Sequence, residues 1–165
     1  MYFSAGFVLG QACLFDRKNA TQTQSYGPEA RGGACHSDVV ISDDDIDYPN
    51  IIKPDILVVM SQDAYNKYVN DLKKGGILII DSKLVEQRIS DPTIKIYEMP
   101  LTETAEKNLG NSIVANVVML GALIAVTNIV STESLKKSIV KRWPRFVELN
   151  FRAFQKGMDL EKDYI

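Results

Sequence analysis

The sequence contains little cysteine or histidine. Its 165 residues include two cysteines, Cys13 and Cys35, and one histidine, His36. An iron–sulfur cluster normally needs four thiolates, and zinc sites place several Cys or His ligands at characteristic spacings. We therefore expect this chain to carry no cluster and no metal of its own. The absence of a cysteine framework and of a secretory leader predicts a reducing, cytoplasmic setting.

A strong charge of one sign and a long hydrophobic run are also absent. The formal net charge is −2, with 24% charged residues. Nucleic-acid binding needs a concentrated basic face, so we expect no nucleic-acid partner. The most apolar segment, Ile113–Val126, is shorter than the roughly 20 residues that cross a bilayer, which predicts a buried helix and no membrane partner. With 45% hydrophobic content, residues 1–165 are expected to form a single domain with its own core.

Motifs of a self-sufficient enzyme are missing as well. The glycines fit neither Gly-x-Gly-x-x-Gly nor a phosphate-binding loop with lysine, and no Gly-x-Ser-x-Gly elbow occurs. His36 and Asp38 share one face of a predicted strand and could pair as acid and base, but no nucleophile accompanies them. The acidic run Asp43–Asp45 lacks calcium-loop spacing and is interpreted as a solvated turn. A free-standing small-molecule enzyme is therefore the least favoured hypothesis.

Hydrophobic periodicity predicts alternating helices and strands, and hence an α/β fold class. The expected strands are Thr21–Ser25, Ala34–Ile41, Ile56–Met60, Ile77–Asp81 and Ile94–Met99. The expected helices cover Ala5–Lys18, the stretch after Ser61, a short helix capped by Thr102, Ile113–Val126, a helix from Ser131 or Thr132, and Arg145–Met158. Ile56–Met60 and Ile77–Asp81, with the helix between them, predict one βαβ unit with a right-handed crossover.

The stretch from Gln24 to Gly33 is rich in turn-forming residues. Gly27-Pro28 favours a turn, and Gly32-Gly33 leaves backbone N–H groups open to close approach. Arg31 supplies a planar, permanently charged fork that suits carboxylate or phosphate. Residue chemistry alone leaves open whether this turn binds something or is only a turn with a solvated arginine.

Ser61-Gln62 ends a predicted buried strand and begins a helix. In a parallel α/β sheet this edge is where ligands gather and where helix N–H groups attract anions. The alternative is that Ser61 only caps the helix. Both interpretations stay open from the sequence.

The stretch Gln24–Gly33 resembles the signature of the gamma subunit of 2-oxoacid:ferredoxin oxidoreductases, and it is most similar to the 2-oxoglutarate type. Three further segments follow in that family's order, namely 39–49, Met60–Tyr65 and Gly75–Ser82. The resemblance implies a three-layer α/β/α domain with a mainly parallel central sheet, similar to domain III of pyruvate:ferredoxin oxidoreductase. Members of the family open with a strand and a Gly-x-Gly-Gly-Gln-Gly turn, whereas Tyr2-Phe3-Ser4 here runs straight into Ala5. This strand and loop are shortened or missing in the sequence, so the N-terminus is assigned no phosphate-binding role.

The resemblance also implies a function. The expected enzyme converts 2-oxoglutarate or another 2-oxoacid plus coenzyme A to acyl-CoA, CO2 and reduced ferredoxin. Thiamine diphosphate, Mg and the iron–sulfur cluster would lie on alpha, beta and, where present, delta subunits. This chain would help assembly and coenzyme A capture, and would be inactive alone. A purely structural subunit is the alternative, and the oligomeric state of the isolated chain stays open.

No catalytic residue is assigned. The candidate cofactor- or interface-binding residues are Gln24, Ser25, Tyr26, Gly27, Pro28, Glu29, Arg31, Gly32, Gly33, Ser61 and Gln62. We leave open whether the Arg31 turn contacts coenzyme A or only a partner subunit.

Overall fold

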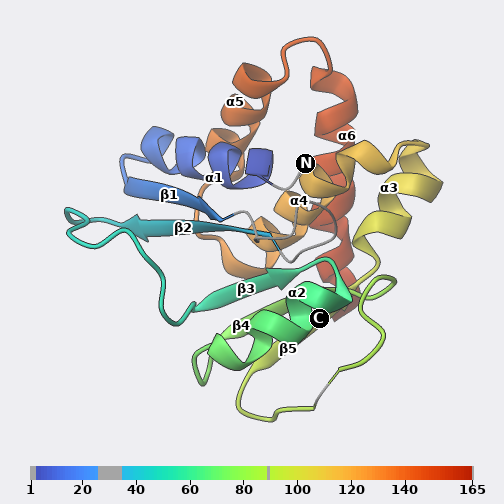
Figure 1. Cartoon of the computed structure of the whole chain (residues 1–165). Coiled ribbons are helices and arrows are strands. Elements are labelled where there is room, and N and C mark those ends of the chain that lie inside the picture. Colours follow the sequence, from blue (N-terminus) through green and yellow to red (C-terminus); the bar gives the residue numbers. More distant parts are fainter. Residues whose placement is uncertain (1–2, 26–34, 89, 165) are drawn as a thin grey trace.

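Helices surround two small sheets in the computed structural model of the chain, which describes residues 3–25, 35–88 and 90–164 (Figure 1). The antiparallel sheet pairs β1 (Asn19–Ser25) with β2 (His36–Ser42), and the parallel sheet has the order β3 (Ile56–Val59), β4 (Ile77–Asp81) and β5 (Lys95–Met99). The predicted α/β class and the parallel βαβ unit are confirmed. The described strands form two separate ladders rather than one continuous sheet.

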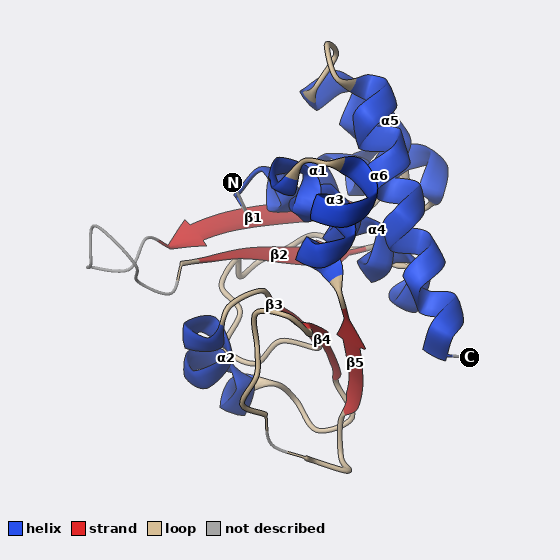
Figure 2. Ribbon diagram, turned by 90° about the vertical axis from the view of Figure 1, so that its right-hand side faces the viewer, coloured by secondary structure: helices blue, strands red, loops and turns tan. Residues whose placement is uncertain are grey.

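The parallel sheet is covered by helices on both faces. Val59, Leu78 and Ile80 pack against Tyr65 and Val69 on the side of helix α2 (Gln62–Tyr68). The alternate residues of the same strands, such as Ile79, join the main core around helix α4 (Ala115–Thr127). Figure 2 shows α2 well apart from the other helices, on the far side of this sheet. This part of the chain therefore has the expected three layers.

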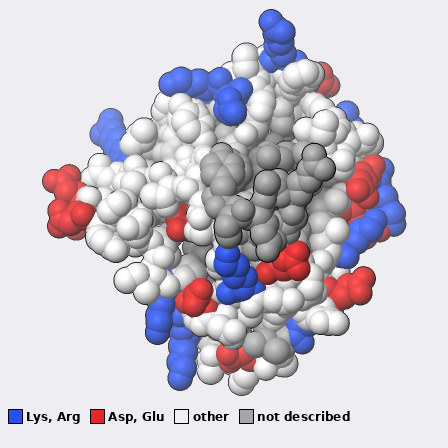
Figure 3. Space-filling view, in the orientation of Figure 1, with Lys and Arg blue, Asp and Glu red and all other residues white. Residues whose placement is uncertain are grey.

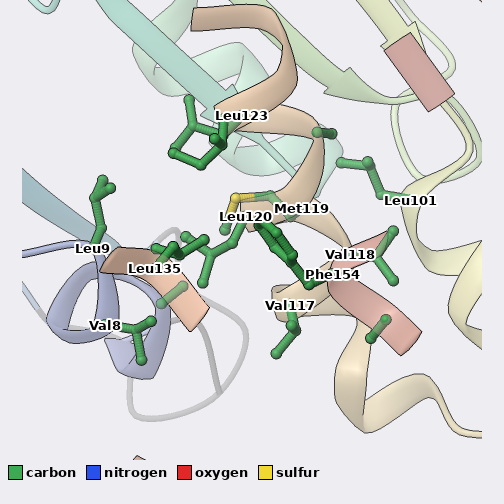
Figure 4. Packing of buried hydrophobic residues seen from close by; sticks show 14 of the residues in the cluster. Val8, Leu9, Leu101, Val117, Val118, Met119, Leu120, Leu123, Leu135 and Phe154 are labelled. Carbon is green, nitrogen blue, oxygen red and sulfur yellow. The ribbon is translucent and has the colours of Figure 1, made fainter. Parts of the chain in front are cut away.

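Helix α4 forms the centre of the main core. All ten residues from Ala115 to Ile124 are buried, which confirms the prediction of a buried apolar helix. Figure 4 shows residues of α4 such as Leu120 packed beside Phe154, Leu135 and Val8. The surrounding helices are α1 (Phe3–Phe15), α3 (Leu101–Leu109), α5 (Thr132–Arg142) and α6 (Val147–Leu160).

Two glycines on facing helices allow α4 and α6 to approach each other closely. Gly121 of α4 lies against the α6 backbone, where an added Cβ would come 2.9 Å from the Met158 nitrogen. Gly157 of α6 faces α4 in return, and a Cβ there would come 2.8 Å from the Val118 carbonyl carbon. Real Cβ atoms do not approach backbone this closely, so the two helices can pack at this distance only because both positions are glycine.

The start of α3 differs from the sequence prediction. Thr102 does not cap the helix, because it lies inside the first turn and Pro100 occupies the N-cap position. The buried carboxylate of Asp81, at the end of β4, supplies the missing acceptor for the N–H of Thr102 (2.9 Å) and for its hydroxyl (2.5 Å). It also accepts the backbone N–H of Lys83 at 3.1 Å. Asp81 therefore joins the parallel sheet to the helical core.

The start of α5 is also fixed by a distant carboxylate. The helix begins at Thr132 with Ser131 as its N-cap, in agreement with the predicted start at Ser131 or Thr132. Asp16, just after α1, accepts hydrogen bonds from the Ser131 N–H (2.5 Å), the Ser131 hydroxyl (2.7 Å) and the Ser134 hydroxyl (2.5 Å). Partial burial alone would raise the pKa of Asp16, but the hydrogen bonds from Ser134 and Ser131 outweigh it and hold the pKa below its usual value.

This arrangement predicts a pH-dependent contribution to stability. Because the pKa of Asp16 is lower in the folded chain, the stabilisation is present above the unfolded pKa, about 4, and is lost as pH falls through the folded pKa. We expect Asp16→Asn to lower the free energy of unfolding by about 1 kcal/mol near pH 7 and by much less near pH 3. Urea unfolding at both pH values measures the difference. Asp43→Asn, at an exposed carboxylate, is the control and should show no such change with pH.

Candidate functional site

The predicted signature turn connects the two strands of the antiparallel hairpin. Ser25 pairs with His36 and Gln24 with Ser37 at this end of the ladder, and both Gln24 and Ser25 are exposed. The other signature residues, Tyr26, Gly27, Pro28, Glu29, Arg31, Gly32 and Gly33, lie outside the described residues. The structure therefore describes the first two residues of the signature and the strand that follows it.

His36, Asp38 and Tyr68 form a polar cluster at the start of β2, just after the signature. His36 Nδ1 lies 2.8 Å from the hydroxyl of Tyr68, and the two rings meet edge to face with centroids 5.0 Å apart. His36 Nε2 lies 3.6 Å from Asp38, which confirms that these two side chains share a face. Burial raises the pKa of Asp38, and the neighbouring His36 partly opposes that shift. Because Tyr68 ends α2, the cluster ties the hairpin to the helix that covers the parallel sheet.

Ser61 and Gln62 begin the same helix. The Ser61 hydroxyl accepts the N–H of Ala64 at 3.2 Å, which is an N-cap. The Gln62 side-chain oxygen accepts the N–H groups of Glu86 (3.0 Å) and Gln87 (2.9 Å), while its NH₂ group donates to the Gln87 carbonyl (2.9 Å) and to Asn66. Gln62 therefore fastens the segment after β4 to the start of α2. Both residues have clear structural roles, and a contact with ligand or partner stays a prediction.

Helix α2 thus connects the two candidate regions, with Ser61-Gln62 at its start and the His36 contact at its end. The sequence pattern did not reveal this link, because His36 and Tyr68 are 32 positions apart in the chain. Nor did it single out Asp81, which stood out only as the last residue of a strand. Both contacts join segments far apart in the sequence, and residue spacing carries no signal for that.

The two cysteines differ in environment. Both are free thiols; Cys13 is buried and Cys35 is exposed. Burial raises the pKa of Cys13 to about 11, with a smaller opposing effect from Lys18. Its thiol is thus protonated and sheltered, as a structural residue in the core is. Cys35 lies two residues after the end of the signature at Gly33 and offers a chemical probe of that region.

We expect iodoacetamide to modify Cys35 and spare Cys13 in the folded chain near pH 8, since only exposed thiolate reacts readily. Peptide mass spectrometry after brief exposure measures both sites in one sample. Denatured chain should be modified at both positions, which is the control. Rapid modification of Cys13 in the folded chain would contradict the buried environment of α1.

No group of three His, Cys, Asp or Glu side chains in the described ranges is arranged to hold a metal ion. None of the described helices is long and apolar enough to cross a membrane.

Comparison with known proteins identifies the family of this chain. Residues 2–160 match the family described as pyruvate ferredoxin/flavodoxin oxidoreductase. The chain is 51% identical over 162 residues to 2-oxoglutarate synthase subunit KorC of Methanocaldococcus jannaschii, covering 96% of this chain and 87% of that protein. It is 50% identical over 163 residues to the subunit of the same name from Methanothermobacter thermautotrophicus, covering 94% and 86%.

A solved structure agrees with these matches. The gamma subunit of keto/oxoacid ferredoxin oxidoreductase from Geobacter sulfurreducens PCA superposes with a TM-score of 0.84 at 40% identity, covering 98% of this chain and 91% of that one. The match includes the hairpin that carries the signature, because it spans nearly the whole chain. The resemblance seen in the sequence is therefore confirmed, and this chain belongs to the pyruvate ferredoxin/flavodoxin oxidoreductase family, as a relative of its gamma subunits.

Proposed function

We propose that this chain is the gamma subunit of a 2-oxoglutarate synthase, a multi-subunit enzyme that converts 2-oxoglutarate and coenzyme A to the acyl-CoA, CO2 and reduced ferredoxin. The observation that carries this proposal is an identity of about half of the aligned residues with two KorC subunits, over nearly the whole of this chain and most of each subunit. The choice of 2-oxoglutarate among 2-oxoacids follows the names of these relatives.

The chemistry in this complex is assigned to other subunits. Two cysteines, one of them buried and protonated, do not supply the four thiolates of a cluster. Among the described residues, no Ser or Cys side chain is hydrogen-bonded to the His36–Asp38 pair, and Nδ1 of His36 is already engaged by the Tyr68 hydroxyl. Thiamine diphosphate, Mg and iron–sulfur clusters therefore belong, in this proposal, to alpha, beta and possible delta subunits. The free thiols agree with assembly in a reducing cytoplasm.

The signature turn is the proposed binding region of the chain for coenzyme A or a partner subunit. Its entry residues Gln24 and Ser25 are exposed, and its exit is held by His36 against α2. We expect Arg31 in this turn to contact a partner subunit or coenzyme A. An arginine fork among glycines suits the phosphate groups of coenzyme A or a carboxylate of another subunit.

Replacement of Arg31 tests this role in the reconstituted enzyme. If Arg31 binds an anionic group of coenzyme A, Arg31→Ala should raise KM for coenzyme A by about tenfold or more, since a charge-assisted hydrogen bond contributes about 1.5–3 kcal/mol. Arg31→Lys should recover only part of this loss, because lysine keeps the charge but not the bidentate fork. Lys74→Ala, at an exposed lysine of the parallel-sheet region, is the control.

The outcomes separate the two roles that remain open for the turn. Loss of subunit association with an unchanged KM in whatever complex forms would favour a purely structural interface. Unchanged assembly together with an unchanged dependence on coenzyme A would remove the turn from both roles.

A further inference from the structure

Positive charge is concentrated at one end of the helical core. Seven of the chain's 19 Lys and Arg residues, but one of its 21 Asp and Glu residues, lie between positions 136 and 156. Figure 3 shows Lys and Arg side chains along the upper rim of the molecule, where Figure 1 places α5 and its connection to α6. Because the whole chain is slightly acidic, this charge is a local feature.

Part of this charge is left without a partner. Lys137 forms an ion pair with Glu133, and Arg142 lies 5.8 Å from the centre of the Phe7 ring. Lys141 and Arg145 are exposed, and neither forms an ion pair with any described residue.

Two apolar side chains lie in the same segment. Val140 is 40% exposed and Phe146 is 61% exposed, directly beside the cations in sequence. We name Val140, Lys141, Arg142, Arg145 and Phe146 the basic corner. Exposed aromatic and aliphatic residues next to arginine are the composition typical of protein–protein contact regions.

Helix stability explains only part of the basic corner. Lys141 and Arg142 end α5, where cations interact favourably with the helix dipole. Arg145 stands just before α6, which begins at Val147, and a cation at a helix N-terminus is unfavourable. The exposed ring of Phe146 contributes little burial either. Arg145 and Phe146 are therefore better explained by binding than by folding.

We propose that the basic corner docks onto an acidic face of another subunit of the oxidoreductase. This inference rests on the proposed function, since it assumes a multi-subunit enzyme. Charge complementarity selects the partner: exposed cations attract a carboxylate-rich surface and accelerate association. The apolar pair favours a protein over a nucleic acid, because Val140 and Phe146 need an apolar counterpart to be buried.

The test measures the affinity of this chain for the remaining subunits of the enzyme. The double variant Lys141→Glu/Arg145→Glu reverses both unpaired cations, and the control Lys53→Glu/Lys74→Glu makes the same change in net charge at exposed lysines in and near the parallel-sheet region. We expect the first variant to bind at least tenfold more weakly at low salt and to lose most of its salt dependence, while the control stays within about twofold. Phe146→Ala should weaken binding at high salt as well, since burial of its ring is not screened.

Four results would overturn the inference. Equal losses in the double variant and its control would show a general effect of net charge. Wild-type affinity in the double variant would show that the basic corner does not bind another subunit. If that complex is also active, the proposed function still holds. Salt-dependent self-association of the isolated chain, abolished by the double variant, would identify a second copy as the occupant. If the wild-type chain itself fails to associate with the other subunits, both proposals fall.

Discussion

Gly157→Ala is expected to lower the free energy of unfolding by about 3 kcal/mol, the largest stability effect that the fold predicts for a single methyl group. The added Cβ would lie 2.8 Å from the Val118 carbonyl carbon, closer still to its oxygen, and 2.9 Å from the Ala122 nitrogen. These are backbone atoms of α4, so no side-chain rotation relieves the contact. Helices α4 and α6 would have to separate, and the core around Leu120 and Phe154 would loosen with them.

Thermal unfolding followed by circular dichroism measures this effect, and a loss of about 3 kcal/mol corresponds to roughly 10 °C in a chain of this size. Gly10→Ala is the matched control, because Gly10 is also helical but a Cβ there meets no atom within 4 Å. Alanine at position 10 should therefore raise stability by about 0.5–1 kcal/mol. Opposite signs for the two substitutions would confirm the helix contact. A neutral result for Gly157→Ala would show that α4 and α6 are not in close contact.

Asp81→Ala is expected to destabilise the chain by a similar amount, about 3 kcal/mol. The carboxylate is completely buried and accepts hydrogen bonds from Thr102 N–H, the Thr102 hydroxyl and Lys83 N–H. Alanine would leave all three donors without their acceptor in a site that water does not reach easily. Since Asp81 also takes the place of a cap on α3, the helix start should fray.

Asp81→Asn separates shape from acceptor capacity, because the amide keeps the size of the side chain but turns one acceptor into a donor. An intermediate loss is expected for it in urea unfolding. Asp55→Ala, at an exposed carboxylate paired with Lys73, should change stability by no more than about 0.5 kcal/mol. If Asp81→Ala kept full stability but abolished the activity of the assembled enzyme, Asp81 would have a role in the complex rather than in the fold.

The predictability of the fold depended on the range of the interaction. Local pattern was sufficient for β4, predicted and observed at Ile77–Asp81, and for a start of α5 at Ser131 or Thr132. The observed ends of several other elements differ from the predicted ends by one to three residues. The contacts that join the elements could not be predicted in this way. Asp16 contacts Ser131 across 115 positions of the chain, and Asp81 contacts Thr102 across 21. A sequence read locally cannot show such contacts.

The candidate site was predictable to a different degree. The signature from Gln24 to Gly33 identified the family because its residues are specific in order, and no calculation of packing was needed. The anchoring of that signature through His36 and Tyr68 followed only from the tertiary structure. The roles assigned to Arg31 and its neighbours are still predictions, since those residues lie outside the described part of the chain.

We propose, above all, that this chain works as one subunit of a 2-oxoglutarate-oxidising complex. The most direct measurement is 2-oxoglutarate-dependent reduction of ferredoxin by the tagged chain, purified together with its co-expressed partner subunits and, in parallel, alone. We expect activity that requires coenzyme A in the co-purified complex, no activity in the isolated chain, and a large loss of activity when this chain is omitted. Turnover by the isolated chain, or a fully active complex that lacks it, would rule out this role.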